Sequence, residues 1–115
     1  MNESILIDIK KLLGLPEEPT TYDVDVILCI NSAFSILYQL GVGPDNGFKI
    51  SDDSAEWSDF IGNTNKLENV KTYVFLKTKL MFDPPTAGPM IEAIKTQISE
   101  LEWRINVAVD PGGDI

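Results

Sequence analysis

The stretch that decides the fold is 66–105, KLENVKTYVFLKTKLMFDPPTAGPMIEAIKTQISELEWRI. Apolar residues recur in both halves at the three- and four-residue spacing of a helix. Asp83 precedes two prolines, and a residue before proline disfavours helical backbone geometry. Pro89 suits the first turn of a new helix. The stretch therefore predicts one helix over about 66–82 and a second that starts near Pro89 and carries its apolar stripe to Ile105.

The same periodicity predicts which side of each helix is buried. The first helix should bury Leu67, Val70, Tyr73, Val74, Leu80 and Met81. The second should bury Ile91, Ile94, Ile98, Leu101 and Ile105, and its other side is polar.

Gly and Pro divide the upstream sequence into further helices, predicted over 4–13, 22–40 and 54–61. Gly14 fits the residue after a helix end. Thr20 with Asp23 resembles a capping box for the long helix, and Asp52 or Asp53 should cap the short one. The predicted inward face of the long helix is Val24, Ile27, Leu28, Ile30, Phe34, Leu37 and Leu40.

The C-terminal residues differ in character from the helices. Val107-Ala108-Val109 alternates as an extended segment does, and Asp110-Pro111-Gly112-Gly113 cannot continue a helix. We predict an all-α protein, a small helical bundle of four to five helices over 1–105 with an extended tail over 106–115.

Composition and charge limit the function classes. The 115 residues are 43% apolar, which suits one globular domain with its own core. The net charge of −9 argues against affinity for DNA, RNA or anionic lipid, although DNA could pass such a surface without sticking. The N-terminus has no basic segment typical of a signal peptide. We expect a protein assembled inside the cell.

No residue pattern indicates catalysis. The chain has no His, so Cys29 lacks the usual base and is interpreted as a core cysteine. Asp52, Ser54 and Glu56 alternate as in a calcium loop, but Trp57 stands where that loop needs Gly, and helix capping explains the acidic residues better. We predict no catalytic residue, no metal site and no cofactor.

Two helices carry apolar or cationic residues off their buried stripes. The helical period places Phe75 away from the buried stripe of its helix, between Lys71 and Lys79. It also places Trp103 away from the buried stripe of the last helix. One interpretation is that the aromatic residues belong to a thick core and the lysines to a solvated face. The other is that these residues form a second surface for a partner. On the second interpretation, Lys71, Phe75, Lys79 and Trp103 form a subunit interface with an acidic neighbouring copy.

The sequence resembles the head-tail connector, or adaptor, proteins of long-tailed bacteriophages, especially small connectors of phages of Gram-positive hosts. The resemblance spans nearly the whole chain and rests on the segments KKLLGLPEE (10–18), ILCINSAFSILYQLGVG (27–43), AEWSDFIG (55–62), YVFLKTKLMFDPPTAG (73–88) and IEAIKTQISELEWRINV (91–107).

This resemblance implies a mechanical role in the virion neck, reached from the host cytoplasm during assembly. Such proteins form rings, typically dodecameric, beneath the portal, extend the DNA channel and offer a platform to the next neck, stopper or tail protein. DNA passes without specific binding, and no membrane is involved. Their C-terminal segments dock on the portal, a role that would fall here on Asn106, Val107, Ala108, Val109, Asp110 and Ile115.

A second hypothesis is a non-enzymatic helical adaptor or regulatory protein that binds a single host or phage protein. The two hypotheses differ in mass, because the first requires a large ring and the second a monomer or dimer.

Overall fold

The computed structural model describes residues 4–61 and 67–109, with side chains described up to Asn106. The described residues form helices and no strand, which confirms the predicted all-α class. The helices are α1 (Ile5–Leu13), α2 (Asp23–Gln39), α3 (Trp57–Phe60), α4 (Leu67–Phe82) and α5 (Gly88–Val109).

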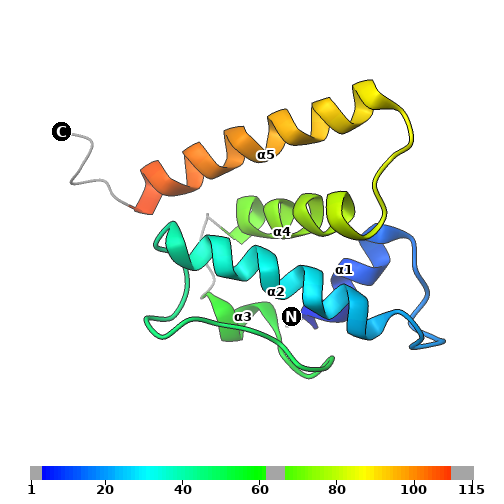
Figure 1. The fold of residues 1–115 in the computed structure, drawn as a ribbon. Coiled ribbons are helices and arrows are strands. Elements are labelled where there is room, and N and C mark those ends of the chain that lie inside the picture. Colours follow the sequence, from blue (N-terminus) through cyan, green and yellow to red (C-terminus); the bar gives the residue numbers. More distant parts are fainter. Residues whose placement is uncertain (1–3, 62–66, 110–115) are drawn as a thin grey trace.

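Helix α4 is the centre of the bundle. It packs against α1, α2 and α5, and Figure 1 shows it between α2 and α5. Its fully buried residues lie on more than one side of the helix, because neighbours cover it from several directions. Met81, predicted to face inward, is exposed, because the last turn of α4 turns Leu80 and Phe82 toward the core instead. The buried residues of α4 are Val70, Tyr73, Val74, Leu76 and Thr78.

Helix α1 begins and ends as its sequence predicts. The Ser4 hydroxyl accepts a hydrogen bond from the backbone N–H of Ile7, 3.2 Å away. Gly14 follows the helix with a φ of 83°, a left-handed conformation that glycine adopts without strain. Two backbone bonds, Gly14 to Lys11 and Leu15 to Lys10, close the last turn.

The predicted capping box of Thr20 and Asp23 is wrong. Asp23 is the first residue of α2, and its carboxylate binds the Nζ of Lys10 at 2.7 Å. Lys10 is only 3% exposed and also donates to the Glu17 carbonyl, 2.8 Å away. The carboxylate is therefore used to pair a buried charge between two helices, and not to cap its own helix.

The predicted inward face of α2 is wrong at two positions. Val24 is 69% exposed and Leu28 is 62% exposed. Helix α2 carries apolar residues on every side, so periodicity alone does not select the side that α4 covers. The fully buried residues of α2 are Val26, Ile30, Ala33, Phe34 and Leu37.

The segment between α2 and α4 is held against α2 by one side chain. The Asn31 amide donates to the Ile50 carbonyl at 2.9 Å and accepts from the Ile50 N–H at 2.8 Å. Gly43 has a φ of 101°, and a Cβ there would lie 2.6 Å from Cε1 of Phe60, so any side chain would collide with the aromatic core.

Helix α3 is shorter than predicted, and neither Asp52 nor Asp53 caps it. Glu56 is its N-cap and forms a capping box with Asp59. Asp52 instead accepts from the backbone and hydroxyl of Ser54 in a local turn. This turn satisfies the carboxylate before the helix begins.

Helix α5 confirms its predicted stripe but extends further than predicted. Ile98 and Ile105 are buried against the rest of the bundle. The prediction that the chain is extended from Asn106 is wrong for 106–109, which are helical, and the boundary at 105 falls inside α5. Three alternating residues are too few to distinguish a strand from a helix that is already propagating. Residues 110–115 lie outside the described part of the chain.

Candidate functional site

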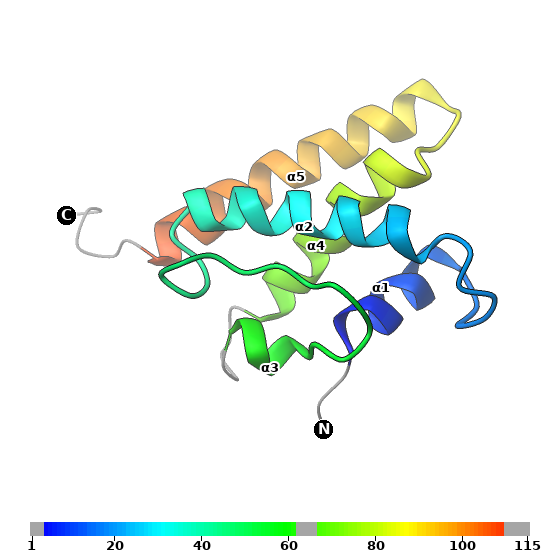
Figure 2. The same ribbon diagram turned by 60° about the horizontal axis from the view of Figure 1, so that its bottom comes forward.

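Exposed apolar side chains gather where several helices end. Figures 1 and 2 place the end of α1, the start of α2, the end of α4 and the start of α5 at one end of the molecule. The Tyr22 ring meets Phe82 edge-on there, with ring centroids 5.9 Å apart. We call this the Tyr22 end and define it by five exposed residues, Leu12, Tyr22, Val24, Met81 and Met90.

Two more exposed aromatic residues belong to the opposite end, where α2 and α5 finish. Trp103 on α5 is 67% exposed, and Tyr38 on α2 is half exposed. Burying an aromatic side chain of this size is one of the largest contributions a single residue makes to an interface. Both ends therefore present surface that a partner could cover.

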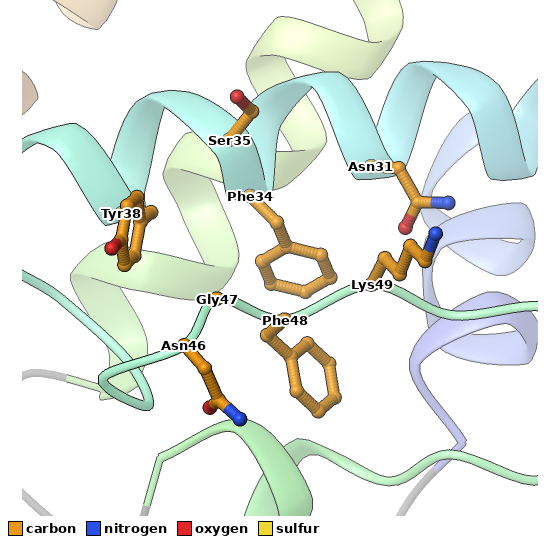
Figure 3. Close-up of a pocket in the computed structure, with 8 residues that line it drawn as sticks. All are labelled: Asn31, Phe34, Ser35, Tyr38, Asn46, Gly47, Phe48 and Lys49. Atoms are coloured by element: carbon orange, nitrogen blue, oxygen red, sulfur yellow. The ribbon is translucent and has the colours of Figure 1, made fainter.

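A groove lies beside Tyr38, between α2 and the segment that follows it (Figure 3). Its volume is about 540 Å³. Figure 3 shows the ring of Phe34 between α2 and the segment that carries Phe48, and the ring of Phe48 on the side of that segment away from α2, with Tyr38 and Lys49 toward opposite sides. We call it the Phe48 groove and define it by its lining residues, Asn31, Phe34, Ser35, Tyr38, Asn46, Gly47, Phe48 and Lys49.

The floor of the Phe48 groove is fixed by packing. Phe34 is buried and meets Phe48 edge-on at 5.1 Å between ring centroids. Both rings also contact Phe60, at 4.5 and 5.2 Å. The Asn31 bonds to Ile50 anchor the next part of the wall. Of the described residues that line the groove, Lys49 alone is charged.

Three of the four predicted subunit-interface residues, Lys71, Phe75 and Lys79, follow one another at four-residue spacing along α4, and Trp103 lies on α5. Lys71 lies 4.0 Å from Asp8 and 5.6 Å from the centroid of the Trp57 ring. Lys79 pairs with Asp83 at 3.1 Å. Phase placed Phe75 off the buried stripe, but it is half-buried and packs against the core. Only Trp103 is largely exposed, and whether any of the four meets a neighbouring copy stays a prediction.

The predicted portal-docking residues lie at the end of α5 and beyond it. Asn106 is exposed, and the backbone of Val107, Ala108 and Val109 is helical. Asp110 and Ile115 lie outside the described residues. Their docking role stays a prediction.

The fold gives Cys29 and Asp52, which were considered for chemistry, surroundings that do not indicate a reactive site. Cys29 is half-buried, and burial, followed by the charge of Asp25, raises the pKa of its thiol, which disfavours the reactive thiolate. The hydrogen bonds from Ser54 lower the pKa of Asp52. Within 4–61 and 67–109, no three His, Cys, Asp or Glu side chains are grouped to hold a metal ion.

Among the residues that the structure describes, none of the helices combines the length and apolarity that crossing a bilayer requires.

Sequence reasoning missed the Tyr22 end and the Phe48 groove. Val24 and Leu28 are four residues apart and out of phase with Val26 and Ile30, so the sequence shows two apolar stripes on α2 but not which of them faces outward. The groove had no comparable signal, because it depends on a contact between residues 31 and 50.

A protein-family model described as phage connector protein matches residues 5–112, which is nearly the whole chain. No curated protein and no solved structure gives a match.

Proposed function

This chain belongs to the phage connector protein family, and on that premise we propose that it forms a ring beneath the portal of the phage head. As a connector it is a structural protein of the virion, at the connection of head and tail. In the proposal, the ring extends the DNA channel and carries the next neck, stopper or tail protein. The ring is dodecameric, as the sequence resemblance implies.

The observation that carries this proposal is the placement of exposed apolar surface at two opposite ends of an acidic bundle. The Tyr22 end gathers side chains from four helices, and Trp103 and Tyr38 lie at the other end. Contiguous exposed apolar patches mark interaction sites. A subunit of a ring that joins two structures needs more than one such surface, for its partners and for its neighbouring subunits, whereas an adaptor for a single partner needs one.

The two ends are assigned to two partners by the position of the C-terminus. Helix α5 ends at the Trp103 side, so portal docking by residues 106–115 puts that side toward the head. The Tyr22 end then faces the tail and serves as the platform for the next protein. In this arrangement the helices of each subunit run between the two partners.

The charge supports passage of DNA through the ring. Eighteen acidic residues stand against nine basic ones. Five of the basic residues pair with carboxylates of the same chain: Lys10, Lys71, Lys79, Lys95 and Arg104. Few cations are left to contact phosphate, so DNA should slide past the protein without being held.

Mass measurement and electron microscopy of the purified chain, alone and with the portal protein, test the proposal. We expect rings in at least one of the two samples, and rings seated on the portal in the second. A monomer or dimer that does not bind the portal protein and binds one other protein would contradict the proposed ring and favour the adaptor hypothesis.

A further inference from the structure

We propose that the ring is closed by a head-to-tail contact in which Trp103 of one subunit enters the Phe48 groove of the next. In this contact Glu100 beside Trp103 faces Lys49 at the groove. The inference rests on the proposed ring, but it names the two surfaces that meet. Experiments could therefore disprove this contact without disproving the ring.

The inserted side chain is Trp103. It is 67% exposed on a helix whose buried stripe, through Ile98 and Ile105, lies on another side. Tryptophan buried at the centre of an interface is among the most frequent energetic hot spots. Among the residues that the structure describes, nothing covers Trp103 in this way, and a partner can supply that cover.

The receiving surface is already built. The Phe48 groove has a volume of about 540 Å³, within the range of pockets that hold drug-sized ligands, and therefore has room for an indole. Phe34, Tyr38 and Phe48 line it with aromatic surface. Because Phe34 and Phe48 are packed against Phe60, the groove needs little ordering when it is filled, which lowers the entropic cost of binding.

The charges of the two surfaces are complementary. On α5 the described neighbours of Trp103 at three- and four-residue spacing are Ser99, Glu100 and Asn106, of which only Glu100 is charged. Glu100 lies 3.5 Å from Arg104 in a pair that is more than half exposed, and such a pair binds weakly. The groove carries one charge of the opposite sign, Lys49.

A second copy of the chain fits this groove better than other occupants. DNA would need several cations, and the groove has one. The exposed ammonium of Lys49 attracts an acidic surface such as that of a second copy of this chain. The chain also supplies an exposed aromatic side chain, Trp103, that can pack on the aromatic lining of the groove.

Trp103 cannot enter the Phe48 groove of its own molecule. Figures 1 and 2 show α5 and the segment that follows α2 on opposite sides of α2 and α4. A contact between two different surfaces is heterologous, and repeating it generates a ring when the rotation closes. The geometry is therefore of the kind that a ring requires.

A charge exchange tests the pairing. The first readout is ring formation in solution. The second is the number of copies of the chain per purified particle, which also detects rings that form only on the portal. We expect Trp103→Ala to raise the concentration for half-assembly by at least about thirtyfold, as for an aromatic hot spot. Lys49→Glu and Glu100→Lys should each raise it about tenfold, and the double variant should restore assembly.

The matched control is Lys11→Glu, which makes the same charge change on α1, far from the groove. It should assemble like the wild type. Circular dichroism and thermal unfolding of every variant separate lost contacts from lost folding.

Mixing two defective copies tests the head-to-tail order. Ser35→Trp fills the groove, and Trp103→Ala removes the side chain that enters it. Each variant alone should remain monomeric, and their mixture should form one-to-one dimers that grow no further. Mixtures that stay monomeric would overturn the proposed contact.

The outcomes distinguish the contact from the ring. If Trp103→Ala and Lys49→Glu both form rings at the wild-type concentration, the proposed contact is wrong and the ring stands. If the wild type forms no ring in solution or in particles, the proposed function itself is wrong.

Discussion

The hydroxyl of Tyr73 donates a 2.7 Å hydrogen bond to the carboxylate of Glu102, and this bond joins the centre of α4 to α5. Tyr73 is 0% exposed, so its hydroxyl has no water as an alternative partner. Helix α5 is otherwise held mainly by its apolar stripe. The bond therefore fixes the rotation of α5, which determines where Trp103 points.

This bond predicts a loss of stability in alkali. Burial, and then the hydrogen bond and charge of Glu102, raise the pKa of Tyr73 well above its ordinary value near 10. The folded state therefore keeps a proton that the unfolded chain releases above pH 10. The contribution of Tyr73 to folding is complete below that pH and is lost as the pH rises further.

The measurement is urea unfolding of the wild type and Tyr73→Phe between pH 7 and 11. At pH 7 the variant should lose about 1 kcal/mol, the usual contribution of one hydrogen bond. Above pH 10 the difference should shrink, because only the wild type must retain the proton. A difference that is constant across this range would contradict the assignment.

The buried pair of Lys10 and Asp23 predicts an asymmetric mutational effect. Asp23→Asn leaves a buried ammonium without its counter-charge and should cost about 2–3 kcal/mol, less than a fully buried pair because Asp23 is partly exposed. Lys10→Met keeps the apolar contacts and should stay within about 1 kcal/mol of the wild type. Thermal and urea unfolding measure both.

Lys11→Met is the matched control for this pair. It makes the same substitution at an exposed neighbour of Lys10 and should be neutral. Equal losses in Lys10→Met and Asp23→Asn would show that the ion pair itself, and not the unpaired charge, governs stability.

The sequence predicts helix ends well where the responsible residues are local. Ser4 and Gly14 bound α1 through contacts within four residues. The double proline ends α4 for the same local reason. The buried side of α2 could not be predicted this way, because the choice between Val24 and Val26 is made by α4, more than forty residues away.

The candidate interface residues also differ in whether local sequence is enough to predict their placement. Trp103 could be selected from helical phase, because α5 has one narrow apolar stripe. Phe75 could not be placed from phase, because α4 is covered from several directions and its off-stripe residue still reaches the core. Lys79 and Asp83 are four residues apart, so their pairing is a local feature of the sequence, whereas only the fold brings Asp8 to Lys71.

Thr78 predicts a stabilising substitution. Its side chain is 0% exposed, and its hydroxyl has no hydrogen-bond partner among the residues that the structure describes. Thr78→Val keeps the shape and removes the buried polar group, which should raise the free energy of unfolding by about 1 kcal/mol. Thr78→Ser keeps the hydroxyl and loses a methyl group, so it should destabilise. A destabilised valine variant would reveal that the hydroxyl has a partner.

The charge predicts no measurable binding to duplex DNA near physiological salt, because too few cations are free to neutralise phosphate. Gel-shift titration checks this. The positive control replaces exposed Asp45, Asp52 and Asp53 with Lys, which should produce binding that weakens steeply with salt. A sub-micromolar affinity of the wild type would contradict both the charge argument and the passage of DNA through the ring.

The last prediction concerns the C-terminal segment. Ile105 is buried, whereas Asn106 is exposed, so a deletion that begins beyond α5 removes no described core contact. Deleting 110–115 should therefore leave the circular dichroism and unfolding temperature unchanged. If this segment docks on the portal, the deletion should abolish attachment and yield DNA-filled heads without tails, counted by electron microscopy.

Two further variants make this test specific. Deleting 107–115 also removes the end of α5 and shows whether the helical residues add to docking. A Gly-Ser segment in place of 110–115 keeps the length and removes the sequence, so it should behave like the deletion if side chains carry the contact. If the shorter deletion still joins heads to tails at normal yield while its rings remain intact, docking belongs to another surface. The 43–53 segment is then the next to test, because it leaves the bundle at the same end as α5 and already presents a packed wall beside Tyr38.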